Sequence, residues 1–194
     1  MTRIAKASLA LLLAATATAA SSQAVTDGEN LVFAPPKDFR VGYTSSHDNR
    51  VMTEYVPAGQ TVDDWAQMVT VQIFHGATVE PAGFLQEVGS LYMGHCPGTS
   101  AKGIFTGQSN GYVVSMLLLK CPNNPKTGKP ETTAFRVIKG RDALYSVQHA
   151  WRAVASDQEV EVAMHALGTV TVCDTRTAEH ACPGPDAAGP PPRS

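Results

Sequence analysis

The sequence predicts an α+β fold in which an antiparallel β-sheet of about six to eight strands is packed by two main helices and one short helix. Two observations lead to this prediction. Segments that alternate between apolar and polar residues come in neighbouring pairs joined by turn residues, as β-hairpins do. Segments with helical periodicity are few and lie between these pairs. Such an order favours hairpins over the crossover connections of a parallel sheet.

Three candidate strands lie near the start of the predicted domain. Residues 30–34 suit a first short strand. Residues 39–43 and 51–56 alternate in part between apolar and polar side chains, and a turn-rich segment at 45–49 separates them. This pattern predicts an antiparallel hairpin.

A short helix followed by a strand is predicted next. Thr61 supplies a capping hydroxyl, Asp64 lies three positions later, and Trp65 begins the apolar residues. That arrangement is typical of a helix with an acidic first turn. Residues 68–74 then alternate and predict a strand. The pattern leaves open whether helix and strand both form or one absorbs the other.

The first main helix is predicted to begin at Pro81, because proline suits the first helical turn. Apolar residues follow at helical spacing until His95, and Pro97-Gly98 end the helix. The apolar stripe consists of Phe84, Leu85, Val88, Leu91 and Tyr92.

The next pair of strands is predicted at 102–109 and 112–120. Asn110-Gly111 separates them, and both residues tolerate the positive φ of a type I′ turn. The second strand is apolar on both faces, as a strand covered on both sides would be. An exposed loop is predicted for 122–131, which is rich in proline and lysine.

Another hairpin is predicted from 132–139 and 143–152. The second main helix follows, since Ser156 and Glu159 form a capping-box pattern. Its apolar stripe consists of Val160, Met164 and Leu167, and Gly168 is a plausible end. Residues 169–173 then form a short strand or continue the helix.

Residues 1–24 match the three-part plan of a secretory signal peptide, with Arg3 and Lys6, an apolar run and small residues before Ala24. An N-terminal membrane anchor is the alternative, but the run is short and ends in polar residues. We therefore expect cleavage after Ala24, a single α+β domain at 25–183 and a disordered Pro/Gly-rich tail at 184–194. The expected location is periplasmic or secreted.

The amino-acid composition favours a folded domain and argues against some classes of protein. Hydrophobic residues make up 43% of the 194 residues and charged residues 16%, which suffices for a packed core. Fifteen basic and seventeen acidic residues give a net charge of −2, which argues against a nucleic-acid partner. No interior stretch approaches the roughly 20 apolar residues of a membrane span, so we expect no transmembrane segment after signal removal. We also expect a monomer.

Export favours pairing of the four cysteines, which allow three connectivities. If the hairpin closes at Asn110-Gly111, residues near 100 face residues near 121. Cys96 then lies just beyond the open end of the hairpin, close in space to Cys121. We therefore expect a Cys96–Cys121 disulfide, which leaves Cys173 and Cys182 to close a short loop. Free thiols are the alternative.

A resemblance adds to this interpretation. The segment 55–61, with Trp65 and the strand 69–72, resembles a stretch in small uncharacterised exported proteins of proteobacteria. The order of elements over residues 30–173 is similar to that of PsbP-like domains. This resemblance implies an antiparallel sheet covered by helices on its faces, a binding or assembly role, and no shared catalytic centre.

No catalytic residue is assigned from the sequence. Residues 107–111 match the G-x-S-x-G nucleophile elbow around Ser109, but that motif requires a strand-to-helix turn, and here a strand follows. The six histidines show none of the spacings of a metal site. The acidic pair Asp63-Asp64 suits a helix N-terminus. We therefore predict neither a metal site nor a cofactor.

One constellation remains as a binding candidate. Tyr145, His149 and Trp151 share one face of a predicted strand, and Arg136 lies on the neighbouring strand. An aromatic face with a cation suits a ligand or partner. The alternative, which we prefer, is that Tyr145, Val147 and Trp151 belong to the core under the last helix.

The sequence thus favours an exported, noncatalytic module that binds an envelope protein or a small ligand. The alternative is a small periplasmic enzyme of the hydrolase type, whose residues converge only in space. A third possibility is a carrier for an apolar ligand, held in a cavity between sheet and helix.

Overall fold

The computed structural model describes residues 25–183, and the predicted signal peptide and tail lie outside this range. The elements within it are β1 (Glu29–Val32), β2 (Phe39–His47), β3 (Arg50–Pro57), β4 (Gln67–His75), α1 (Pro81–His95), β5 (Ser100–Ser109), β6 (Tyr112–Asn124), β7 (Lys129–Lys139), β8 (Ala143–Trp151), α2 (Asp157–Thr169) and β9 (Thr171–Asp174).

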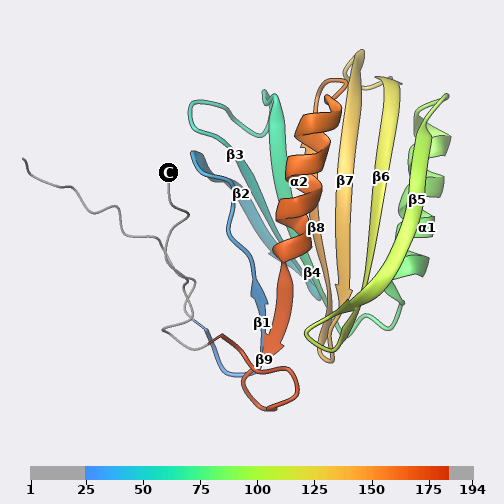
Figure 1. Ribbon diagram of the computed structural model, residues 1–194. Coiled ribbons are helices and arrows are strands. Elements are labelled where there is room, and N and C mark those ends of the chain that lie inside the picture. The colour runs from blue at the N-terminus through green and yellow to red at the C-terminus, as the bar shows by residue number, and fades with distance from the viewer. Residues whose placement is uncertain (1–24, 184–194) are drawn as a thin grey trace, which may run out of the picture.

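Seven of the described strands form one antiparallel sheet in the order β2-β3-β4-β8-β7-β6-β5 (Figure 1). Each of two meanders, β2-β3-β4 and β5-β6-β7-β8, pairs its own neighbours, and α1 connects them along the chain. The pairing of β4 with β8 joins the meanders into one sheet. A separate antiparallel pair forms from β1 and β9. The predicted α+β class is confirmed.

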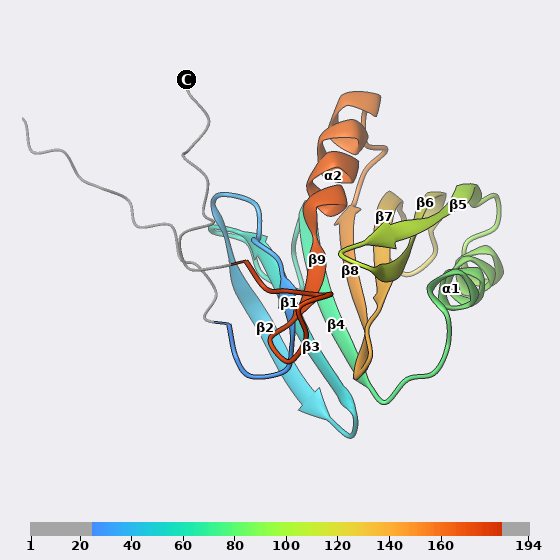
Figure 2. The ribbon, with the colours of Figure 1, turned by 60° about the horizontal axis from the view of Figure 1, so that its bottom comes forward.

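The two helices cover opposite faces of the large sheet (Figure 2). Alternate residues of β6 point to the two faces, so Leu117 and Leu119 pack under α1 with Leu85, whereas Met116 and Leu118 belong to the cluster that includes the buried side of α2. This double coverage explains why the sequence of β6 is apolar on both faces.

The local signals for both main helices act as predicted. Pro81 occupies the first turn of α1. At α2, Ser156 Oγ accepts the Glu159 backbone N–H at 3.2 Å, and Glu159 Oε2 accepts the Ser156 backbone N–H at 2.8 Å. These reciprocal bonds form a complete capping box.

The short helix predicted from Thr61 and Asp64 does not form. Thr61 Oγ1 accepts the Asp64 N–H at 3.2 Å within a turn instead of capping a helix. Arg152, the residue after β8, has its guanidinium carbon 4.2 Å from the centroid of the Trp65 ring and donates to the Asp63 carbonyl at 2.9 Å. These contacts hold the segment against the sheet, where β4 begins two residues after Trp65.

The exposed loop predicted for 122–131 is much shorter than expected. β6 continues to Asn124 and β7 begins at Lys129, so only a tight turn remains. The Asn124 carbonyl accepts the backbone N–H groups of Thr127 and Gly128. The strands extend because Asn124 of β6 still pairs with Lys129 of β7, closer to the turn than Pro122 and Pro130. The register of the two strands shifts between Cys121 and Asn124.

Two disulfides form with the expected pairing, Cys96–Cys121 and Cys173–Cys182. The turn that brings the first pair together has positive φ at Asn110 (49°) and Gly111 (77°), as a type I′ hairpin requires. None of the helices within residues 25–183 has the length and apolar character needed to cross a membrane.

Candidate functional site

Two adjoining cavities lie beside α1, on the sheet face that this helix covers only in part. Their volumes are about 270 and 190 Å³, and Leu91 and Tyr92 line both. We call their combined surface the α1 groove. Besides these two residues, its lining consists of Gln72, Phe84, Val88, His95, Cys96, Cys121, Asn124, Pro125, Lys126, Glu131, Phe135, Ser146 and Gln148.

One flank of α1 forms the helical wall of the groove. Phe84, Val88, Leu91 and His95 lie at positions i, i+4, i+7 and i+11, which share one side of a helix. Eleven residues of helix span about 16 Å, so the wall is long rather than compact. Leu91 is 59% exposed although it is apolar. The groove therefore presents unburied apolar surface along its length.

The sheet provides an uncharged, hydrogen-bonding wall opposite the helix. Gln72 of β4 lies beside Ser146 of β8 in the ladder, and Gln148 lies two residues further along β8. Thr70, opposite Gln148, is buried and its Oγ1 has no hydrogen-bond partner among the described residues. Amides and hydroxyls of this kind can donate and accept without bringing a charge.

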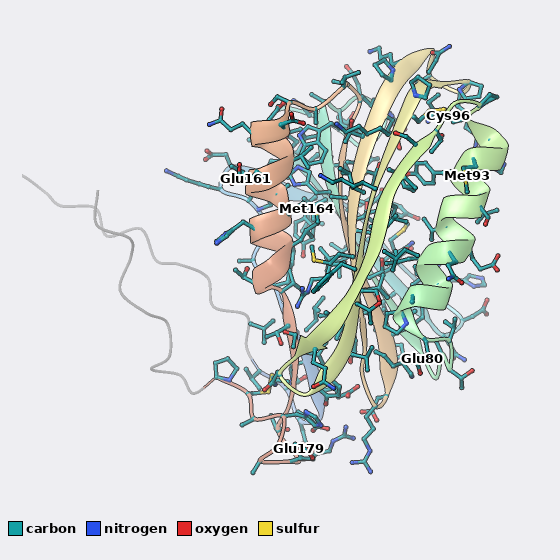
Figure 3. All side chains as sticks on the ribbon, turned by 45° about the vertical axis from the view of Figure 1, so that its right-hand side comes forward. Glu80, Met93, Cys96, Glu161, Met164 and Glu179 are labelled. Atoms are coloured by element: carbon teal, nitrogen blue, oxygen red, sulfur yellow. A yellow bond between two sulfur atoms is a disulfide. The ribbon has the colours of Figure 1, made fainter. Side chains whose placement is uncertain are left out.

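The far end of the groove is fixed by a polar cluster and a disulfide. Tyr92 Oη donates to Glu131 Oε1 at 3.1 Å, and Asn124 Nδ2 donates to Glu131 Oε2 at 2.9 Å. Burial and the neighbouring Glu131 charge raise the pKa of the Tyr92 hydroxyl, so it stays protonated as a donor. Cys96 and Cys121 form part of the wall, and Figure 3 labels Cys96 at the end of α1.

The four residues singled out in the sequence lie on the other face of the sheet, toward α2. Tyr145 and Trp151 are buried in the core cluster to which α2 contributes, as the preferred alternative predicted. Tyr145 Oη donates to Glu29 at 3.3 Å. His149 stacks on Trp151 with ring centroids 4.2 Å apart. The structure thus brings His149 and Trp151 together, whereas Tyr145 has a different partner. Because Tyr145 and Trp151 are buried, they belong to the core and do not form an open site.

Arg136 differs from the other three. It is 5% exposed, its Nε has no hydrogen-bond partner among the described residues, and its Nη1 lies 3.8 Å from Met116 Sδ. No carboxylate in the described part of the chain forms an ion pair with it. Burial lowers the pKa of its guanidinium.

The remaining motifs do not assemble into a site. Ser109 ends β5 and donates to Thr171 Oγ1 at 3.1 Å, in a strand–turn–strand context. Within residues 25–183, no group of three or more His, Cys, Asp and Glu side chains is arranged to hold a metal ion. His47 pairs with Asp48 at 2.7 Å in an exposed turn.

The α1 groove was not predicted from the sequence. The sequence does contain a signal for it. The apolar stripe of α1 includes both Leu91 and Tyr92 and is broader than is needed to pack the helix against a sheet. The sequence does not show, however, that α1 leaves cavities beside it, because their lining also comes from strands that only the tertiary structure pairs, such as β4 with β8.

No protein-family model and no curated protein matches the chain. Solved structures that resemble it include the Ran-binding protein Mog1p of Saccharomyces cerevisiae, with 11% identity, 73% of this chain and 85% of that chain covered, and a TM-score of 0.44. LpqN, involved in cell envelope biogenesis of Mycobacterium tuberculosis, has 17% identity, coverage of 74% and 83%, and a TM-score of 0.39. Cyanobacterial PsbP (CyanoP) from Synechocystis sp. PCC 6803 has 8% identity, coverage of 78% and 94%, and a TM-score of 0.36. Likenesses this distant assign no family, activity or partner to the chain.

Proposed function

We propose that this protein is an exported, noncatalytic binding module, and that its α1 groove holds an extended segment of a protein of the cell envelope. The observation that carries the proposal is that the two cavities share Leu91 and Tyr92 and so continue along one side of α1. The two disulfides support a location where thiols are oxidised.

The length of the groove suits an extended chain. A helical wall of about 16 Å matches about five residues of extended backbone, at roughly 3.3 Å per residue. A compact ligand would fill one cavity and leave the other empty.

The chemistry of the two walls is complementary to a peptide. Phe84, Val88 and Leu91 offer contacts for alternate apolar side chains of the segment. Gln72 and Gln148 can donate to and accept from its backbone amides. Because these two walls face one groove, one segment can satisfy both.

The test is selection of a displayed random heptapeptide library on the purified protein, followed by titration of the selected peptides. We expect enrichment of peptides with alternating apolar residues. Leu91→Glu should weaken their binding at least tenfold, because it places a charge between the two cavities.

Met93 provides a matched control on the same helix. It is 53% exposed, close to the value for Leu91, but lines neither cavity (Figure 3). Met93→Glu should leave peptide affinity unchanged. Equal loss in both variants, or selection of no peptide, would contradict the proposal. Occupancy of a single cavity by a small apolar compound would indicate a carrier instead.

We further propose that residues 25–183 fold as one domain and that the processed protein is monomeric. Light scattering coupled to size-exclusion chromatography tests the monomer, and N-terminal sequencing of exported material tests cleavage after Ala24.

A further inference from the structure

Arg136 is a buried cation without a counter-ion in the described part of the chain. Within residues 25–183 its guanidinium makes one weak hydrogen bond, from Nη1 to the sulfur of Met116 at 3.8 Å, and its Nε makes none. Buried charges in proteins are normally paired, because the loss of hydration is otherwise uncompensated. Folding alone therefore does not explain an arginine at this position.

The position of Arg136 within the sheet indicates where a counter-ion would enter. Val147, Arg136, Met116 and Phe105 lie in register across β8, β7, β6 and β5, on the face toward α2. Because Nη1 of Arg136 reaches Met116, the guanidinium points toward the β5 edge. Phe105 at that edge is 66% exposed.

Two lysines add positive charge to the same region. Lys102 of β5 pairs with Leu118 of β6, and Lys120 lies two residues further along β6, so both belong to the face toward α2. The Lys120 ammonium lies 3.9 Å from the exposed Asp157 carboxylate at the start of α2. Figure 3 looks onto this region, with α2 and β5 in the foreground and Met164 labelled on α2.

We propose that Arg136 is the receptor for the acidic head group of a single-chain anionic amphiphile that enters between α2 and β5. A carboxylate or a phosphate monoester would supply the missing negative charge and accept from Nε and the terminal nitrogens. Lys102 and Lys120 attract the anion from solution. The site is separate from the α1 groove, because the two lie on opposite faces of the sheet.

The apolar part of the ligand follows from the surroundings of the guanidinium. Met116 and Val147, its neighbours in register, offer no donor that could replace the hydration shell of an inorganic anion. The exposed Phe105 ring adds apolar surface at the entrance. An anion with an attached alkyl chain gains from this surface, whereas free phosphate does not.

We expect Arg136 to provide ligand binding and, at the same time, to lower the stability of the unliganded protein. Replacing it by methionine should weaken binding at least tenfold, and it should also raise the melting temperature of the unliganded protein, because an uncompensated buried charge is removed. A residue that lowers stability but provides binding is expected at a functional site.

The experiment is calorimetric titration of the delipidated full-length protein with decanoate and decyl phosphate below their micellar concentrations. Decyltrimethylammonium and inorganic phosphate serve as probes that lack the negative charge and the alkyl chain, respectively. We expect binding of at least one anionic amphiphile at least tenfold tighter than of either control probe. The preferred head group distinguishes a carboxylate from a phosphate ligand.

Variants complete the test. Arg136→Met should lose at least tenfold in affinity and melt at a higher temperature, Arg136→Lys should retain part of the affinity, and Phe105→Ser should weaken binding without unfolding the protein. Lys37→Met, at an exposed lysine that precedes β2 and lines neither cavity, is the control and should leave the affinity for decanoate and decyl phosphate unchanged. The proposal is overturned if Arg136→Met binds normally, if it melts lower while Arg136→Lys restores stability, or if phosphate binds as tightly as decyl phosphate.

Discussion

The imidazole of His149 lies flat on the indole of Trp151, with ring centroids 4.2 Å apart and an angle of 7° between the planes. His149 Nε2 lies 3.0 Å from Gln67 Oε1, and the Phe39 ring meets the imidazole edge-on. Burial among these groups lowers the pKa of His149 from 6.5 to about 4. The stack therefore contains a neutral imidazole at neutral pH.

This depressed pKa makes the stability of the protein dependent on pH. Between pH 6.5 and 4 the unfolded chain binds a proton at His149 that the folded protein excludes, so the free energy of unfolding falls as the pH decreases. We expect a loss of about 2 kcal/mol between pH 7 and 4.5 from this residue. Urea denaturation at several pH values measures it.

His149→Phe is the comparison for the pH dependence. Phenylalanine retains an aromatic ring for the stack but does not titrate, so the difference between pH 7 and 4.5 should shrink by about 2 kcal/mol. An unchanged pH profile in this variant would show that the imidazole titrates normally in the folded protein.

The capping box of α2 gives a second prediction. Ser156→Ala removes the acceptor for the Glu159 backbone N–H and should lower the free energy of unfolding by about 1 kcal/mol. Ser90→Ala in α1 is the matched control, since the Ser90 hydroxyl only bonds back to the Gln86 carbonyl on an exposed surface. That substitution should be neutral or slightly stabilising. Thermal or urea denaturation of both variants measures the change. Equal losses in the free energy of unfolding would argue against a specific role of the cap.

The Cys96–Cys121 disulfide gives a third prediction, because it attaches the end of α1 to β6 beside the α1 groove. Its ring spans a sequence separation of 25, and removal by Cys96→Ser/Cys121→Ser should cost about 3.5 kcal/mol by the chain-entropy model. Hydrogen exchange should increase in the last turns of α1.

The second disulfide is the natural comparison. Cys173–Cys182 spans a separation of 9 and lies outside the groove lining. Removing it should cost about 2–3 kcal/mol and leave exchange in α1 unchanged. If both double variants loosened α1 equally, the first disulfide would not be a specific support of the groove.

Local signals in the sequence determined the elements that depend on neighbouring residues. Asn110-Gly111 specifies its hairpin because both residues accept positive φ, and Pro81 and Ser156 specify helix starts through their own backbone and side-chain chemistry. Disulfide pairing followed from one of these turns, since a closed hairpin brings Cys96 close to Cys121.

Tertiary contacts decided what those local signals left open. Thr61 carries a capping pattern, yet Arg152 from the distant end of β8 binds the carbonyl and the ring that follow it, and a turn results. The ends of β6 and β7 were underestimated because each strand stabilises the other beyond its own propensity.

The sequence by itself determined the α+β class, the two main helices, the hairpins and the disulfide pairs, because each of these rests on periodicity or on turns between neighbouring residues. Only the tertiary structure decided that β4 pairs with β8, that Leu91 borders a groove, and that Arg136 is buried without an ion-pair partner among residues 25–183. The physical reason is that burial and pairing depend on side chains brought together from distant parts of the chain, which no local pattern records.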